Sequence, residues 1–296
     1  MLQFYFRNAT EQMNNLLFAL IIVLSLTPLA RLHADEPRVL ATVHPLTLMA
    51  ASLVDNPQTL IPGNVTPHDF AFRPSDMRRL QQAEIVIWSG AANEPYMPRL
   101  IKRWPQKHWI DVSVFADPHA GHTHTPGQQD DTHHQDGHWW FDPQVMLKAQ
   151  QQLAAILGLS PEPFRQQVME QLQRSEQLLR PLRQQGFFVF HQAYDRWVDY
   201  FDLNQLGAFT ISPQQKPGLR TLNAMRQQLE QHQLSCVFTE PQFSSALVSS
   251  VIGELPVKTV ELDPLGRHIS VTKQGYAEFL NDLTQRFVRC LTPPQH

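Results

Sequence analysis

Short apolar segments alternate with helical patterns along nearly the whole chain, and this alternation most constrains its fold. The apolar segments are rich in Val, Ile, Phe and Trp and have the length of buried strands. They lie at residues 39–43, 84–88, 109–112, 187–190, 207–211, 236–239 and 257–262. The helical patterns lie at 46–54, 75–82, 94–104, 192–200, 219–231, 243–253 and 273–288. Strands that alternate with helices predict an α/β fold with parallel sheets.

The middle of the chain differs from both halves because it is polar, Gln-rich and without a strand pattern. One face of this segment is apolar at intervals of four residues, formed by Phe164, Val168 and Leu172. Pro181 should end or kink the helix near its close. We therefore expect two similar α/β lobes, residues 35–142 and 187–296, joined by a helical connector at 143–186. Ligands of such sheets bind beyond the carboxyl ends of the strands, so the cleft between the lobes is the expected site.

The N-terminal segment has the pattern of an export signal. Residues 16–30 form an apolar run that is too short to span a bilayer comfortably and long enough for a signal core. Ala34 suits the position before a cleavage site, and removal of 34 of the 296 residues leaves 262. The positive region upstream is weak because Arg7 is offset by Glu11, and Met13 is an alternative start. We expect an exported chain cleaved after Ala34; a membrane anchor or a buried helix is the alternative.

Composition excludes several classes of protein. The chain is 42% hydrophobic and 17% charged, which argues against disorder. A formal net charge of -3 argues against nucleic-acid binding through phosphate contacts. In an oxidising compartment, Cys236 and Cys290 are expected to form a disulfide, with two buried free thiols as the alternative. A zinc site made of cysteines alone is excluded because it needs more ligands than these two.

One segment concentrates histidines. Between His119 and His138 there are six His and three Asp in twenty residues, without large apolar side chains. Such a segment cannot bury itself and predicts a mobile surface loop. Imidazoles at this density bind zinc, copper or nickel transiently, so we interpret the loop as a low-affinity metal collector. A merely solvated loop is the alternative. The collecting residues would be His119, His122, His124, His133 and His134.

Three histidines stand apart from that collector. His68, His138 and His191 each lie where a strand edge meets a loop, and they come from both lobes. Taken singly, each is more often a structural histidine than a ligand. Together with Asp263 they form a possible set of three imidazoles and one carboxylate in the cleft. Three imidazoles favour zinc, whereas hard oxygen ligands suit manganese, magnesium or calcium.

Ordered blocks of sequence resemble the cluster A-I metal-binding proteins of ABC importers, and especially the periplasmic zinc-uptake proteins of Gram-negative bacteria. That group also has a His-rich loop before the second ligand and a similarly placed cysteine pair. The resemblance covers essentially the whole mature chain. Its blocks are Pro67-His-Asp-Phe70, Arg73-Pro-Ser-Asp76, residues 83–90 with Glu94, His138-Trp-Trp-Phe-Asp-Pro143, His191-Gln-Ala-Tyr194, Thr239-Glu-Pro-Gln-Phe243 and Asp263-Pro-Leu-Gly266.

The resemblance implies two lobes joined by a long rigid helix, with one metal ion between them. Carried over by position, His68, His138 and His191 would be the metal ligands. Manganese-binding relatives tend to have a carboxylate at the third position, so His191 points to zinc. Asp263 would be a fourth ligand or would support the ligands, with water as the alternative. Glu240 could orient a ligand histidine, although it could equally be a plain helix start.

These features predict a periplasmic protein that captures Zn²⁺ and delivers it to an inner-membrane ABC permease driven by a cytoplasmic ATPase. We expect a monomer that performs no chemistry. A manganese-binding member of the same family is one alternative. A secreted mononuclear zinc hydrolase is another, but it needs a general base beside the metal, and no His-Glu-x-x-His motif is present. A surface metal-binding adhesin is disfavoured because no cysteine near Ala34 could carry a lipid.

Overall fold

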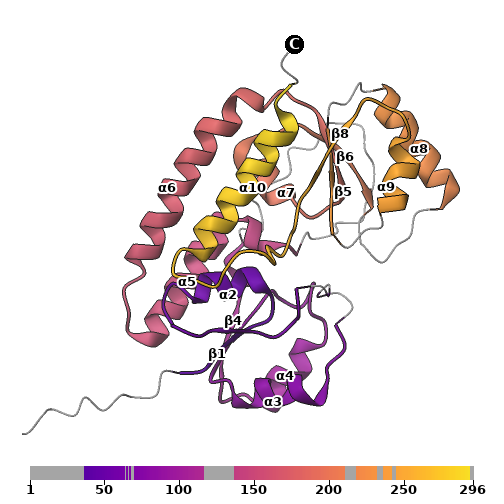
Figure 1. The fold of residues 1–296 in the computed structure, drawn as a ribbon. Coiled ribbons are helices and arrows are strands. Elements are labelled where there is room, and N and C mark those ends of the chain that lie inside the picture. Colours follow the sequence, from indigo (N-terminus) through magenta and orange to yellow (C-terminus); the bar gives the residue numbers. More distant parts are fainter. Residues whose placement is uncertain are drawn as a thin grey trace, which may run out of the picture. The chain divides into compact units, whose positions relative to one another are not determined.

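The fold was analysed in a computed structural model that describes most of the chain after the expected signal segment (Figure 1). The described residues are 37–63, 65, 67, 70–116, 137–210, 218–231, 236–241 and 245–293. They contain two four-stranded sheets in which all paired strands are parallel. The predicted α/β class is therefore confirmed.

The first sheet has the strand order β2-β1-β3-β4. Its strands are β1 Val39–Ala41, β2 Gln58–Thr59, β3 Ile85–Trp88 and β4 His108–Asp111. The helices of this lobe are α2 His44–Ala50, α3 Pro74–Gln82, α4 Met97–Arg103 and the 3-10 helix η2 Val112–Phe115. Sequence patterns predicted every one of these strands except β2, whose two residues are too few to form a pattern.

The second sheet repeats this topology, with the order β6-β5-β7-β8. Its strands are β5 Phe187–His191, β6 Gln205–Thr210, β7 Cys236–Thr239 and β8 Lys258–Glu261. The helices are α7 Asp195–Phe201, α8 Leu219–Gln231, α9 Ser245–Ile252 and α10 Gly275–Leu291. In both sheets the first strand of the lobe pairs with the second on one side and the third on the other. In each sheet the strand order therefore reverses between the first and third strands, and at the carboxyl edge such a switch point is where open parallel sheets bind ligands.

The expected connector, residues 143–186, contains two helices and one short 3-10 turn, namely α5 Pro143–Leu157, α6 Glu162–Leu179 and η4 Arg180–Leu182. The 3-10 helix η3 Trp139–Phe141 comes just before it. Gly158 ends α5 in the left-handed conformation, with φ of 66°. The 18-residue α6 is the long helix that the resemblance implied, and its apolar face is buried along α10 (Figure 1). Pro181 lies in η4, immediately after α6 ends, as predicted.

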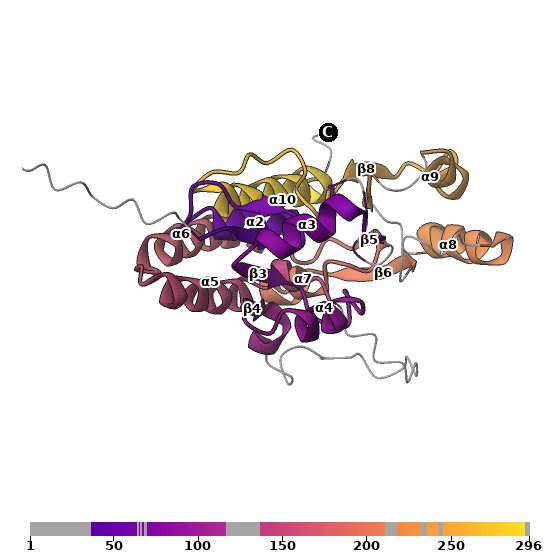
Figure 2. The same cartoon turned by 90° about the horizontal axis from the view of Figure 1, so that it is seen from below.

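Helix α10 links the parts of the fold. It packs against α6 and the second sheet, and its first turn contacts α2 of the first lobe (Figures 1 and 2). Cys290 of α10 forms a disulfide with Cys236 of β7, with their Cα atoms 5.6 Å apart, which confirms the predicted pairing. Among the described residues, no helix has both the length and the apolar character needed to cross a membrane.

Candidate metal centre

His191 and Glu240 lie side by side at the carboxyl edge of the second sheet. His191 is the last residue of β5, and Glu240 directly follows β7, the strand paired with β5. Their exposed fractions are 2% and 3%, and His191 Nδ1 lies 3.4 Å from Glu240 Oε2. Neither Nδ1 nor the Glu240 oxygens make a hydrogen bond of good geometry within the described part of the chain. A carboxylate in this position orients the imidazole so that Nε2 is left to bind an ion.

His138 brings a second imidazole to the same place. Its ring centre lies 5.1 Å from that of His191, with the ring planes at 76°. Two imidazoles on one tetrahedral zinc ion, with Zn–N bonds of about 2.0–2.1 Å, have their ring centres about 5 Å apart. His138 is only 6% exposed. The pair thus has the separation and the burial that a shared metal ion requires.

Both lobes hold the segment that contains His138. From the first lobe, the Asn93 side-chain amide donates a hydrogen bond to the Gly137 carbonyl. From the second, the Pro264 carbonyl accepts a hydrogen bond of 2.7 Å from Trp140 Nε1. The Tyr276 hydroxyl donates to the Trp140 carbonyl at 2.9 Å. These contacts restrain the backbone on either side of His138.

A buried polar cluster occupies the carboxyl edge of the first sheet. Glu94 is fully buried, and its Oε1 accepts hydrogen bonds from the Thr42 hydroxyl at 2.7 Å and from the Ser89 amide at 2.9 Å. The Ser89 hydroxyl also donates to this oxygen. Burial raises the pKa of Glu94 to about 7, although these hydrogen bonds partly oppose the shift. Asn93, the chain neighbour of Glu94, donates a hydrogen bond of 3.4 Å to the Ser89 hydroxyl and another to the Gly137 carbonyl, so the cluster is linked to the segment that contains His138.

Tyr194 lies three residues after His191 and near the Glu240 carboxylate. The side chain is fully buried, and its hydroxyl has no hydrogen bond of good geometry to any described residue. Burial and the nearby Glu240 carboxylate raise the pKa of Tyr194 well above its usual value. The tyrosine therefore stays neutral and adds no charge that would compete with a cation.

Asp263 lies just after β8, at the start of the loop that leads to α10, and is 7% exposed. Its Oδ1 accepts a hydrogen bond from the Leu265 amide at 3.1 Å. Its Oδ2 accepts two from Arg267, one from the amide and one from Nε, both at 2.9 Å. In the described part of the chain, no three His, Cys, Asp or Glu side chains are grouped closely enough to hold a metal. The role of Asp263 as a fourth ligand stays a prediction.

Several predicted residues lie outside the described ranges. They are the first ligand His68, the collecting histidines His119, His122, His124, His133 and His134, and the signal segment 1–34. The chain next to His68 is described in part: the Tyr96 hydroxyl donates a hydrogen bond of 3.2 Å to the Pro67 carbonyl.

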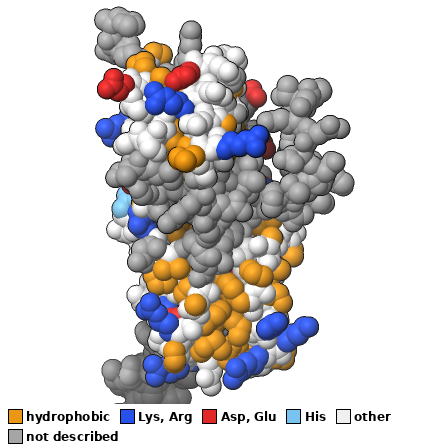
Figure 3. All heavy atoms as spheres, turned by 90° about the vertical axis from the view of Figure 1, so that its right-hand side faces the viewer, with side chains coloured by type: hydrophobic (Ala, Val, Ile, Leu, Met, Phe, Trp, Pro, Cys, Tyr) orange, Lys and Arg blue, Asp and Glu red, His pale blue; other side chains and the backbone are white. Residues whose placement is uncertain are grey.

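Tyr96 belongs to an aromatic cluster with Phe70 and Phe72, whose rings lie 5.0–6.3 Å apart. Apolar side chains gather on the first-lobe half of the face in Figure 3.

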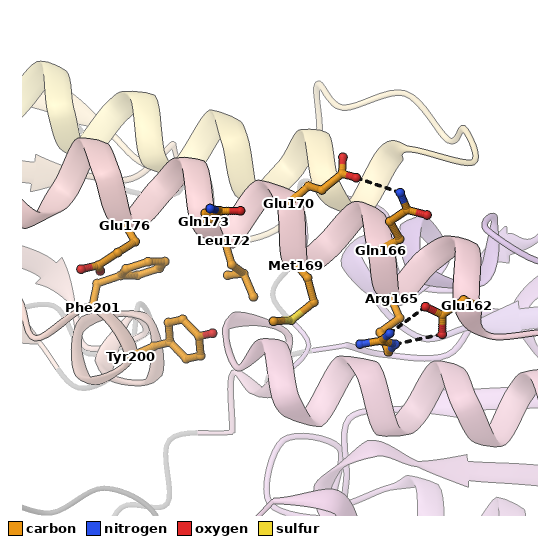
Figure 4. Close-up of a pocket in the computed structure, with 10 residues that line it drawn as sticks. All are labelled: Glu162, Arg165, Gln166, Met169, Glu170, Leu172, Gln173, Glu176, Tyr200 and Phe201. Atoms are coloured by element: carbon orange, nitrogen blue, oxygen red, sulfur yellow. Dashed lines mark hydrogen bonds and ion pairs between the residues drawn. The ribbon is translucent and has the colours of Figure 1, made fainter.

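A pocket of about 650 Å³ lies elsewhere, along α6 and α7 (Figure 4). Its acidic side chains already have partners: Glu162 pairs with Arg165 at 2.7 Å, and Glu176 pairs with Arg183 at 3.0 Å. Figure 4 also shows the hydrogen bond from Gln166 to Glu170. The pocket contains no histidine or cysteine, so it does not offer the ligands that zinc prefers.

Comparison with known proteins decides the family. The model of the ZnuA family, described as zinc-uptake complex component A, periplasmic, matches residues 39–290. The chain belongs to the ZnuA family. The high-affinity zinc uptake system protein ZnuA of Yersinia pestis is 33% identical over 288 residues, which cover 86% of this chain and 91% of that protein. The protein of the same name from Haemophilus ducreyi is 30% identical, covering 91% and 98%.

Solved structures share the fold. A crystal structure of ZnuA superposes with a TM-score of 0.72 at 20% identity, covering 87% of this chain and all of that one. The laminin-binding protein Lmb of Streptococcus agalactiae, described as a bifunctional protein with adhesin and metal transporting activity, gives 0.70 at 18% identity, covering 86% and 100%. These likenesses show that ZnuA proteins and this chain share two parallel-sheet lobes.

Two supporting residues of this ZnuA-family site were not predicted. Asn93 follows the first-lobe strand β3, and only its contact with Gly137 shows that it supports His138. Arg267 follows the Asp-Pro-Leu-Gly block, where its sequence neighbours give no sign that it pairs with Asp263. Polar residues just beyond a strand end were the available signal, and it led to His68, His138, His191, Glu240 and Asp263 but not to these two residues.

Proposed function

We propose that this chain captures Zn²⁺ in the periplasm and hands it to the permease of an ABC importer whose ATPase lies in the cytoplasm. The single observation that carries the proposal is the buried pair His138 and His191, with ring centres 5.1 Å apart. Glu240 beside His191 Nδ1 supports it, because ligand histidines commonly face a carboxylate at their other nitrogen. ZnuA-family proteins are binding components of transport systems and not enzymes.

The proposed ligands are His68, His138 and His191. The geometry of Asp263 favours water as the fourth ligand, because the two Arg267 donors occupy both lone pairs of Oδ2 and Leu265 occupies one of Oδ1. Three neutral imidazoles leave the full charge of the zinc ion in the site, and the buried Glu240 carboxylate offsets part of that charge. This donor set favours zinc over manganese.

The finer points of the proposal rest on the sequence. Cleavage after Ala34 would release a mature chain, which we propose acts as a monomer. Its units would be a first lobe at 35–142, a connector at 143–186 and a second lobe at 187–296. Within the first lobe, the His-rich loop 119–138 would collect metal weakly before it reaches the tight site. Deleting 119–134 should therefore remove weak binding and spare the tight site.

The proposal is tested by measuring zinc affinity in competition with a chromophoric chelator. His68→Ala, His138→Ala and His191→Ala should each weaken binding by orders of magnitude, because each removes one of few ligands. His108→Ala is the matched control, since His108 is exposed at the start of β4 and should not change affinity. Unchanged affinity in His138→Ala or His191→Ala would refute the ligand assignment.

A further inference from the structure

The segment between β8 and α10 crosses from the second lobe to the first. Figure 1 shows it leaving the second sheet and passing beside α2 before α10 begins. Asp263 fixes the start of this crossing segment, residues 262–274, because its carboxylate accepts the Leu265 amide and both Arg267 donors. The Arg267 side chain is thereby tied to Asp263 by a charge-assisted pair of 2.9 Å.

From that anchor, Arg267 reaches the first lobe. Its aliphatic carbons lie directly on Gly63, because a Cβ added to Gly63 would be 2.6 Å from Arg267 Cγ and 3.0 Å from Cδ. A glycine is needed at position 63 for this close approach. Gly63 and Arg267 also line one pocket of about 360 Å³ together with His44. His44 Nε2 makes a hydrogen bond of 2.9 Å to the Ile269 carbonyl and provides a second link to the crossing segment.

Gly63 lies five residues before His68 in the sequence. We propose that Asp263 and Arg267 form a clamp that presses on Gly63 and positions this part of the first lobe, so that Asp263 is a positioning residue and not a zinc ligand. This inference rests on the proposed function.

The chemistry of the carboxylate supports this assignment. The Asp263 carboxylate is buried and already accepts three hydrogen bonds, two of them from Arg267. In the clamp, the Asp263 carboxylate keeps its hydrogen bonds from Leu265 and Arg267.

Zinc affinity distinguishes a clamp from a ligand. Asp263→Asn and Arg267→Ala should each weaken binding roughly 10-fold, as removal of supporting groups does in metal sites. The double variant should be no worse than Asp263→Asn alone, because both changes break the same clamp. Arg226→Ala is the matched control, since Arg226 forms a comparable i,i+4 pair with Glu230 on α8. If Asp263→Asn lost orders of magnitude while Arg267→Ala kept or gained affinity, Asp263 would be a ligand and the inference wrong.

Cobalt(II) in place of zinc reports the ligands directly through its visible absorption. Asp263→Asn and Arg267→Ala should both keep the wild-type cobalt spectrum, because neither residue of the clamp contacts the ion. A spectrum altered in Asp263→Asn and unaltered in Arg267→Ala would overturn the inference.

A test that needs no metal separates this inference from the proposed function. In metal-free protein, hydrogen exchange of the amides in residues 58–67 should accelerate in Asp263→Asn and in Arg267→Ala. Unchanged exchange there would refute the clamp even if zinc binds as proposed. Conversely, if the wild-type protein binds no zinc but both variants still exchange faster than the wild type, the proposed function is refuted and the clamp is retained.

Gly63→Ala tests the other end of the clamp. The added methyl group should displace Arg267 and weaken zinc binding several-fold, and it should have no further effect when Arg267 is already Ala. Gly218→Ala is the matched control, because a Cβ there meets no atom within 4 Å. A Gly63→Ala effect of the same size in the Arg267→Ala background would contradict the contact.

Discussion

The imidazole of His138 meets that of His191 edge to face, with ring centres 5.1 Å apart and planes at 76°. The two residues are more than fifty positions apart in the sequence and belong to different parts of the fold. His191 ends a strand of the second sheet, whereas His138 precedes the connector. Their meeting point is the carboxyl edge of the second sheet, where open parallel sheets bind ligands.

Glu240→Gln should weaken zinc binding about 10- to 100-fold, because the neutral amide neither offsets the charge of the ion nor orients His191 as well. The change is isosteric, so the fold should persist. Glu261→Gln is the control, since Glu261 is exposed at the end of β8. Equal affinities of the two variants in chelator competition would show that Glu240 does not support the ligand.

Zinc affinity should fall steadily as the pH is lowered from 7.5 to 5.5, because protons compete with the ion for the imidazoles. Calorimetric titration at several pH values measures this dependence. In buffers of different ionisation enthalpy, the same titrations count the protons released on binding. A flat affinity profile across this range would argue against histidine ligation.

Protein stability should depend on Glu94. Its folded pKa of about 7 is higher than the ordinary glutamate pKa of 4.5, so the folded state keeps a proton that the unfolded state loses between these values. The wild type should therefore lose roughly 3 kcal/mol of unfolding free energy from this group as the pH rises from 4.5 to above 7. Glu94→Gln should remove that part of the dependence, whereas Glu84→Gln on the surface should not. Urea unfolding of metal-free protein at pH 5 and pH 8 measures it, and parallel pH profiles of wild type and Glu94→Gln would contradict the expectation.

The disulfide should contribute substantially to stability. Cys236 and Cys290 are 54 positions apart, and closing a loop of that length stabilises the folded state by about 4 kcal/mol in the chain-entropy model. The Cys236→Ala/Cys290→Ala double variant should lower the urea midpoint by a corresponding amount. Wild-type protein in reducing agent should show a similar loss. A midpoint that changes in neither case would show that the packing of α10 on β7 holds the lobe without the covalent bond.

Much of the fold could be predicted because its signals are local. Each buried strand is a short apolar run, and each helix has a periodic apolar face, as Phe164 and Val168 show on α6. Strand β2 was not predicted, because the two residues that pair with β1 are too few to form a sequence pattern. For the site, the sequence predicted candidate residues but not the contacts between them. The contacts of Asn93 with Gly137 and of Arg267 with Gly63 depend on tertiary packing, which no local pattern encodes.

X-ray absorption at the zinc edge tests the central claim most directly. The sample should be zinc-loaded protein with residues 119–134 deleted, so that only the tight site contributes to the signal. We predict one zinc ion per chain, with imidazole nitrogens at about 2.0–2.1 Å and the outer-ring scattering of histidine. His191→Ala should reduce the histidine contribution or abolish zinc retention. A chain that retains no zinc, or a first shell without histidine scattering, would contradict the account.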